Sequence, residues 1–156
     1  MKKISDYLKN DHARCDDLFT QTEFYVNQKR WDDAQISFNL FRDFLNKHIN
    51  IEESIIFPAL EYAIDSATGP TNIMRMEHVY IRGINHHLYE SINKKNTVSF
   101  FDHSDTLQLI LQQHNLKEED TWYAMIDRAL NSTKNEVIHA MKAIYRNESV
   151  IAEHLP

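Results

Sequence analysis

Apolar residues recur every three or four positions along four long stretches of this 156-residue chain. That spacing places them on one face of an α-helix, so it predicts four amphipathic helices that share a core. The predicted helices cover roughly residues 5–28, 31 to beyond 55, 72–92, and 99 or 104 to 130. A shorter amphipathic segment continues to about residue 148.

Four interruptions punctuate this pattern. Pro58 lacks a backbone N–H, so we expect it to kink the second helix or to end its regular part. Residues 67–71 contain adjacent glycine and proline and form the clearest predicted break between helices. Residues 93–96 are typical of a turn, and residues 131–133 form a further break before the C-terminal segment.

Short connections between long helices indicate antiparallel neighbours. The fold class is therefore predicted to be all-α: an up-down-up-down antiparallel four-helix bundle with a short C-terminal extra helix. We expect a single domain over residues 1–156, with the bundle at about 4–131 and the helical extension at about 133–150.

Composition narrows the function classes. Two glycines and three prolines are too few for a many-turned β architecture. A formal charge of −6 argues against a nucleic-acid partner, which needs a basic surface. No apolar run approaches the roughly 18 residues of a membrane span, and the N-terminus lacks the apolar core of a secretory signal. A single cysteine cannot form an internal disulfide, which agrees with a cytoplasmic location.

One pattern of histidine and glutamate residues occurs twice in the chain. In both copies the second histidine lies 36 positions after the first (48 − 12 and 114 − 78), and a glutamate follows four positions later. Every member of the second copy comes 66 positions after its counterpart (78 − 12, 114 − 48 and 118 − 52). The two copies are His12, His48 and Glu52, and His78, His114 and Glu118.

These six residues have the chemistry of a two-metal site. Residues four apart on a helix share a face, and all six positions fall in line with apolar residues, so we expect them to point into the bundle. Burying imidazoles and carboxylates without partners is costly, and metal coordination removes that cost. Four terminal histidines and two bridging glutamates suit iron and leave coordination positions open for hydroxide, O2, NO or peroxide.

Alternative interpretations fit less well. A lone histidine with a glutamate four positions on is usually a solvated surface pair, but two copies in register on apolar stripes argue against that. A ferritin-like di-iron bundle needs Glu-x-x-His on each of two helices, and the chain has one, from Glu136 to His139. The zinc-protease motif His-Glu-x-x-His is absent, and structural zinc prefers a closed tetrahedral site.

The assembled residues resemble the hemerythrin-like (HHE cation-binding) family. Segment 48–58, His-Ile-Asn-Ile-Glu-Glu-Ser-Ile-Ile-Phe-Pro, is similar to the family's second-helix signature. The segments that fall where its other helices supply ligands are Asp11-His12, Glu77-His78, and His114 with Glu118-Glu119. The resemblance covers roughly residues 4–131. It implies two iron ions (Fe2+/Fe3+) with an oxo or hydroxo bridge, held by four terminal histidines and two bridging glutamates.

Two departures separate the chain from oxygen-carrying hemerythrins. Arg82 stands where those proteins have a further histidine, and Glu118 lies four positions after His114, where they usually have an aspartate five positions on. The four-histidine, two-glutamate set looks more like the iron–sulphur cluster repair di-iron proteins and related NO- or oxygen-responsive members. Those usually carry an additional N-terminal cysteine-containing domain, whereas this chain begins directly with the expected bundle.

Three function hypotheses follow. The first is a cytoplasmic di-iron protein that binds a diatomic molecule or peroxide for oxygen or NO sensing, scavenging or iron handling. The second is an enzyme that reduces NO or peroxide, or an iron–sulphur cluster repair protein acting under nitrosative or oxidative stress. The third is a non-catalytic iron-storage or iron-sensing bundle. The sequence identifies no catalytic residue and no electron donor, and it leaves a homodimer open.

Several further residues have open roles. Cys15 is either a redox thiol or a small core residue, and Arg82 either steers an anion to the site or makes a salt bridge. Candidates to hydrogen-bond the ligand imidazoles are Glu23, Asn85, Tyr89 and Tyr123. The remaining histidines are expected at the surface: His86, His87, His103, His139 and His154.

Overall fold

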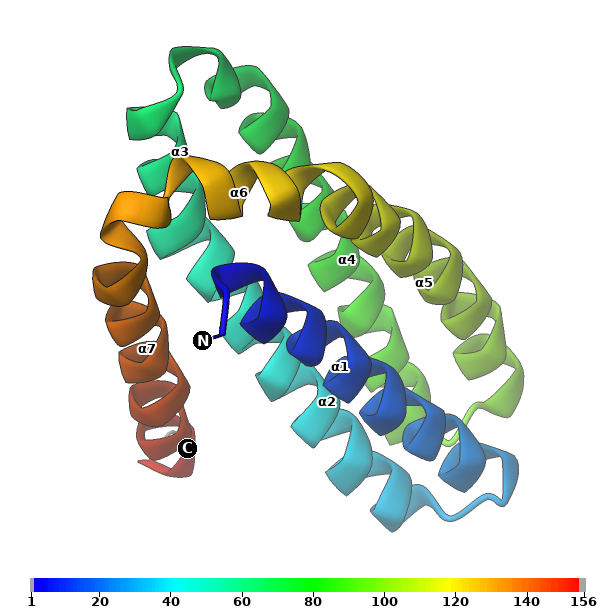
Figure 1. Cartoon of the computed structure of the whole chain (residues 1–156). Helices are drawn as coiled ribbons and strands as arrows, with labels where there is room; N and C mark the ends of the chain where they lie inside the picture. Colours follow the sequence, from blue (N-terminus) through cyan, green and yellow to red (C-terminus); the bar gives the residue numbers. More distant parts are fainter. Residues whose placement is uncertain (1, 155–156) are drawn as a thin grey trace.

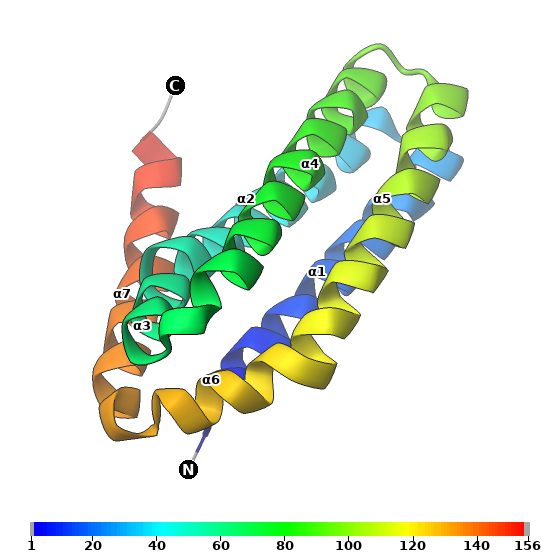
Figure 2. The same cartoon turned by 90° about the horizontal axis from the view of Figure 1, so that it is seen from above.

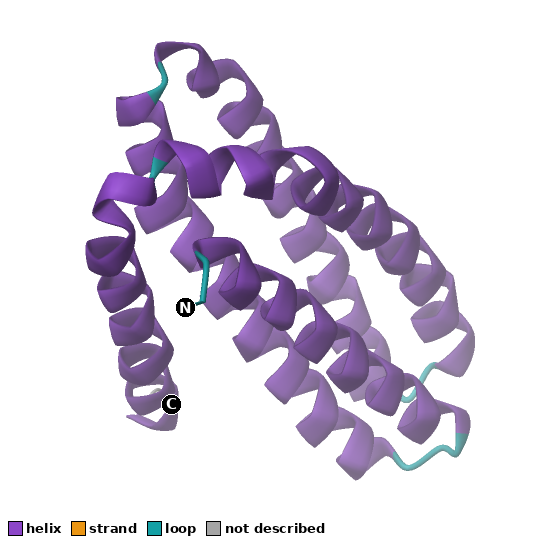
Figure 3. Cartoon of the chain, viewed as in Figure 1, coloured by secondary structure: helices purple, strands orange, loops and turns teal. Residues whose placement is uncertain are grey.

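The computed structural model describes residues 2–154, and the side chains of residues 2–146. The described residues form helices joined by short loops, with no strand among them (Figure 3). The elements in chain order are α1 (Ile4–Asn27), α2 (Trp31–Ile51), the π-helical turn η1 (Glu52–Ile56), α3 (Phe57–Ala63), the 3₁₀ turn η2 (Asp65–Ala67), α4 (Thr68–Asn93), α5 (Thr97–Lys117), the π-helical turn η3 (Glu118–Trp122), α6 (Tyr123–Ala129), the 3₁₀ turn η4 (Asn131–Thr133) and α7 (Lys134–His154).

Four long rods make up the bundle (Figure 1). They are α1, α2 continued by η1 and α3, α4, and α5 continued by η3 and α6. Consecutive rods run antiparallel, and α1 also packs against α5 and α6, which closes the ring. Helix α7 lies outside this ring, against α2, α1 and η1 (Figure 2). The predicted all-α four-helix bundle with a C-terminal extra helix is confirmed.

Both glutamate-containing rods have a π-helical turn at the same place. The N–H of Phe57 bonds to the carbonyl of Glu52, and the N–H of Tyr123 bonds to the carbonyl of Glu118. Pro58 follows the first of these turns, so the regular α-helix does end before it, as predicted. The second rod has Ala124 at the matching position, so proline alone does not explain the turns. Turns of this kind occur often at functional sites.

The predicted break at residues 67–71 is misplaced by a few residues. The chain turns at Ile64, which is extended (φ −134°, ψ 108°), and α4 already begins at Thr68. Gly69 and Pro70 therefore lie in the first helical turn, where a backbone N–H has no partner within the helix and proline costs little. The turn predicted at residues 93–96 is confirmed. The Asn96 side chain caps α5 by accepting a hydrogen bond from the Ser99 N–H at 3.0 Å.

Two clusters of buried apolar side chains fill the bundle, and the predicted metal ligands lie between them along each rod. One cluster includes Phe19, Phe41 and Phe100. The other includes Ile56 and Phe57 and continues to residues of α7. This arrangement shields a polar layer from water on both sides. Among the described residues, no helix is long and apolar enough to cross a membrane.

Candidate metal centre

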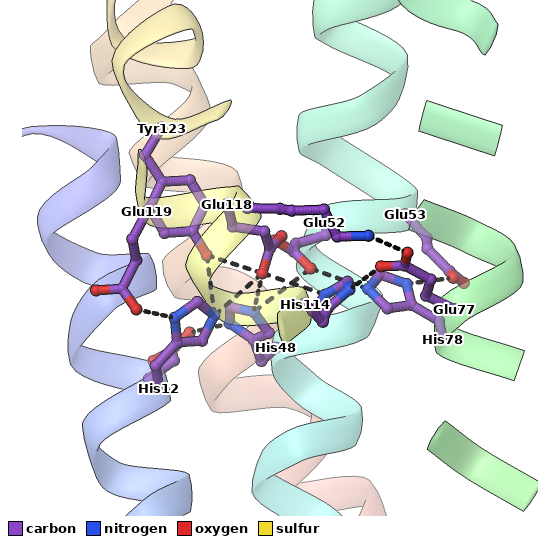
Figure 4. Close-up of polar contacts among 12 residues, drawn as sticks. His12, His48, Glu52, Glu53, Glu77, His78, His114, Glu118, Glu119 and Tyr123 are labelled. Carbon is purple, nitrogen blue, oxygen red and sulfur yellow. Dashed lines mark hydrogen bonds and ion pairs between the residues drawn. The ribbon is translucent and has the colours of Figure 1, made fainter. Parts of the chain in front are cut away.

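Each of the four rods delivers one histidine to the polar layer between the apolar clusters. His12, His48, His78 and His114 come from α1, α2, α4 and α5 in turn, and Glu52 and Glu118 are the first residues of η1 and η3. All six are at most 5% exposed. Their side chains point toward one another across the bundle axis (Figure 4). The structure therefore brings together every residue that the repeated pattern singled out.

The six side chains form two groups of three. We call His12, His48 and Glu118 the first triad, and Glu52, His78 and His114 the second triad. In each triad one ligand atom per residue lies within 4.8 Å of the other two. Two imidazoles and one carboxylate at this separation are able to hold a metal ion. Among the described residues, these are the two groups with such geometry.

Glu118 contacts imidazoles of both triads. Its Oε1 lies 3.1 Å from Nε2 of His12, 3.9 Å from Nε2 of His48 and 3.2 Å from Nε2 of His114. Because His114 belongs to the second triad, this carboxylate spans the space between the two candidate metal positions.

Glu52 spans the same space from the other side. Its Oε1 lies 3.4 Å from Nε2 of His48 in the first triad and 3.2 Å from Nε2 of His78 in the second. Both glutamates thus contact imidazoles of both triads, so each would be placed to hold two metal ions at once.

A second carboxylate stands behind each imidazole, at Nδ1. The four Nδ1–carboxylate distances are 3.1 Å for His12 to Glu119, 3.0 Å for His48 to Asp11, 2.8 Å for His78 to Glu53 and 2.7 Å for His114 to Glu77. A carboxylate at Nδ1 selects the tautomer that carries its proton there, so the lone pair of Nε2 points inward. This outer ring prepares all four histidines to bind a cation.

The outer ring follows the 66-residue repeat. Glu77 comes 66 positions after Asp11 (77 − 11), and Glu119 comes 66 positions after Glu53 (119 − 53). These acids stand beside the ligands in the sequence, but the residues predicted to hydrogen-bond the imidazoles did not include them. The signal was present in the repeat, because an acid recurs at the same offset as each histidine.

The sequence-based candidates for this outer ring are mostly wrong. Glu23 accepts hydrogen bonds from Ser104 and Gln108, away from the histidines. The Arg42 guanidinium lies over the ring of Tyr89, 4.6 Å from the centroid of that ring. The Asn85 amide is buried, with no hydrogen-bond partner among the described residues.

Tyr123 is the candidate that does reach the centre. Its hydroxyl lies 3.0 Å from Nε2 of His12 and 3.3 Å from Oε1 of Glu118. The residue 66 positions earlier, Phe57, stacks on His78 without a polar group. The two triads therefore differ in their aromatic neighbour.

Several buried polar atoms of the layer lack the partner that a cation would supply. Nε2 of His48, Nε2 of His78 and both carboxylate oxygens of Glu52 make no hydrogen bond to the described residues. Orphaned buried groups of this kind are rare because each costs free energy. Lone pairs of nitrogen and oxygen that face one another fit two positive ions, so the donor set suits a di-metal centre.

The pKa values of the buried histidines and of Glu118 also show that the polar layer favours positive charge. Burial by itself lowers the pKa of His114, but the hydrogen bond and charge of Glu118, the Glu52 charge and the Glu77 hydrogen bond together raise that pKa to about 9. Burial also lowers the pKa of His48, but the Glu52 charge and the hydrogen bonds to Asp11, Glu118 and Glu52 together raise it well above its ordinary value. Burial alone raises the pKa of Glu118, yet the neighbouring Glu52 carboxyl group and the imidazoles of His114, His12 and His48 together hold it well below the usual range. Metal binding therefore has to displace protons.

Other residues singled out by sequence lie outside the layer. Arg82 places its guanidinium 3.4 Å from Glu53, so it makes a salt bridge and does not enter the centre. Within the part of the chain whose side chains are described, the exposed histidines are His86, His87 and His139, as predicted. His103 is half-buried, with its ring stacked 4.9 Å from that of His87. The side chain of His154 lies outside the described residues.

Cys15 is expected to be unreactive in the folded protein. It is 4% exposed, and burial raises the pKa of its thiol to about 12, so little of the reactive thiolate is present near neutral pH. Iodoacetamide should label it at least about tenfold more slowly in native protein than in urea-unfolded protein. Equal labelling rates would identify an accessible redox thiol instead.

The fold and the site together define a class: a four-helix bundle with a buried, histidine- and carboxylate-lined centre able to hold two cations. Residues 3–126 match the model of the hemerythrin HHE cation-binding domain. The chain belongs to that family, and α7 lies beyond the matched residues. No match is found among curated proteins or among solved structures.

Proposed function

We propose that this protein binds two iron ions in its polar layer. His12, His48, His78 and His114 would be terminal ligands through Nε2, and Glu52 and Glu118 would bridge. One observation carries the proposal: four Nε2 atoms converge on two shared carboxylates while each Nδ1 is held by an outer carboxylate. That double ring is the arrangement by which proteins orient metal-bound histidines.

The donor set favours iron over a structural zinc ion. Each position is offered two imidazole nitrogens and oxygens of two shared carboxylates, a mixed set that suits iron. Membership of the hemerythrin family supports the same metal, because its centres are typically di-iron. Two such ions would supply one-electron redox chemistry and open coordination positions for O2, NO or peroxide.

The surrounding residues control access to these positions. The apolar clusters exclude bulk water from the ends of the layer. A cavity of about 690 Å3 opens between α1 and α5 and reaches the layer, with a lining that includes His12, Asp16, Phe41 and Glu119. A diatomic molecule or peroxide fits this route. His12, which lines this cavity, has the Tyr123 hydroxyl 3.0 Å from its Nε2, so this hydroxyl lies next to the proposed metal ligand.

On this basis we propose a role in oxygen or NO sensing, scavenging or iron handling. The second candidate is an enzyme that reduces NO or peroxide, or an iron–sulphur cluster repair protein. Arg82 favours this second candidate. Its side chain pairs with Glu53, whereas oxygen-carrying hemerythrins have a further histidine ligand at this position. One fewer protein ligand leaves more room for turnover at the metal.

Metal analysis and anaerobic gas addition test the proposal together. Freshly purified protein should contain about two irons per chain, and the diferrous form should change its optical spectrum when O2, NO or H2O2 is added. A reversible change supports binding and sensing, whereas repeated consumption of NO or peroxide supports the enzyme. Protein that folds fully yet binds no iron after anaerobic reconstitution would contradict the proposal.

A further inference from the structure

The carboxylates behind the second triad are each paired with a cation. The Lys117 ammonium lies against Oε2 of Glu77, whose other oxygen holds His114. Arg82 lies 3.4 Å from Oε1 of Glu53, whose other oxygen holds His78. Both histidines of this triad therefore rest on carboxylates whose negative charge is partly cancelled.

The carboxylates behind the first triad have no such cations among the described side chains. Asp11, which holds His48, is 3% exposed and accepts a hydrogen bond from the uncharged Tyr145 hydroxyl at 2.5 Å. Glu119, which holds His12, is 38% exposed at its side chain. Among the described side chains, no lysine or arginine nitrogen forms an ion pair with either acid.

This difference acts on metal binding through electrostatics. A cation near a metal position repels the incoming ion and weakens the pull of its own carboxylate on the imidazole proton. An uncharged donor such as Tyr145 orients Asp11 and leaves its charge in place. We propose that the two triads fill in order, the first triad taking its metal ion before the second, with Lys117, Arg82 and Tyr145 as the residues that set the order.

Helix α7 contributes one of the residues that set the proposed order of metal binding. It lies beyond residues 3–126, which match the family model, yet its Tyr145 reaches Asp11 in α1. The carbonyl of Tyr145 also accepts from the Lys47 ammonium at 3.3 Å, which ties α7 to α2 one residue before His48. Tyr145 is thus a positioning residue that acts on the first triad through Asp11.

Zinc titration of metal-free protein with 15N-labelled histidine tests the order. Zinc is diamagnetic and accepts the same ligands, and a slightly alkaline buffer limits proton competition. At one equivalent, the Nε2 signals of His12 and His48 should move while those of His78 and His114 stay in place. If all four signals move together, or if the second triad moves first, the inference is overturned.

Variants identify the residues responsible. The double variant Lys117→Met with Arg82→Met should strengthen the second binding step, so the ratio of the two binding constants falls about fivefold. Added salt should reduce the same ratio in the unaltered protein, because both cations are partly exposed. Tyr145→Phe should instead weaken the first step by about tenfold and spare the second.

Arg30→Met is the matched control. Arg30 forms an exposed ion pair with Asp33 at the far end of the bundle, so its removal should leave both binding constants unchanged. Unchanged constants in the Lys117/Arg82 and Tyr145 variants would overturn their assignment. The inference rests on the proposed two-metal site, and the two fail differently: two ions bound without order refute only the inference, and no bound ions refute both.

Discussion

Glu118→Ala is expected to abolish binding of two metal ions and to leave at most one per chain. Glu118 is 1% exposed, and its Oε1 lies within 4.0 Å of three imidazoles drawn from both triads. Alanine removes the oxygens that two positive ions would share, so their mutual repulsion is no longer offset. Glu52→Ala should have the same effect, because Glu52 also contacts both triads.

Iron content per chain after anaerobic reconstitution measures this loss, with circular dichroism to confirm that the helices are intact. His86→Ala is the control, because that imidazole is 65% exposed and pairs with Glu90 on the surface. Glu118→Gln keeps the shape but removes the charge, and we expect it to bind the second ion at least about tenfold more weakly. Two irons per folded chain in either alanine variant would contradict the bridging assignment.

Removing the metal is expected to lower the thermal unfolding midpoint by about 10 °C for each ion lost. A ligand present at about 1,000 times its Kd stabilises a folded protein by about 4 kcal/mol, and 1 kcal/mol corresponds to about 2–4 °C in a domain of this size. The physical source is the set of buried polar atoms on His48, His78 and Glu52, which lack hydrogen-bond partners among the described residues.

Differential scanning calorimetry of chelator-treated and iron-reconstituted protein gives this shift directly. Glu118→Ala supplies the comparison: with at most one ion to lose, its midpoint should move by about half as much. Identical midpoints with and without iron, at full iron loading, would show that the polar layer is stable without a cation and would contradict our account of the orphaned atoms.

The sequence by itself determined the bundle and the membership of its polar layer. A helical period of apolar residues is local information, and short connections leave antiparallel packing as the available arrangement. The matched offsets of His12–His48 and His78–His114 place all four histidines at one level of such a bundle. The convergence of these side chains with Glu52 and Glu118 in the structure follows from that arithmetic.

Only the tertiary structure decided which groups stand behind these ligands. The spacing of residues shows which side chains share a face of one helix, but the rotation of that helix against its neighbours determines what the face meets. Asp11 therefore reaches His48 across a helix interface rather than its own neighbour His12, and Tyr145 reaches Asp11 from a helix 134 residues away in sequence. The same packing assigned Lys117 and Arg82 to one triad and an uncharged hydroxyl to the other, because hydrogen bonds and ion pairs between helices depend on distances that no periodicity encodes.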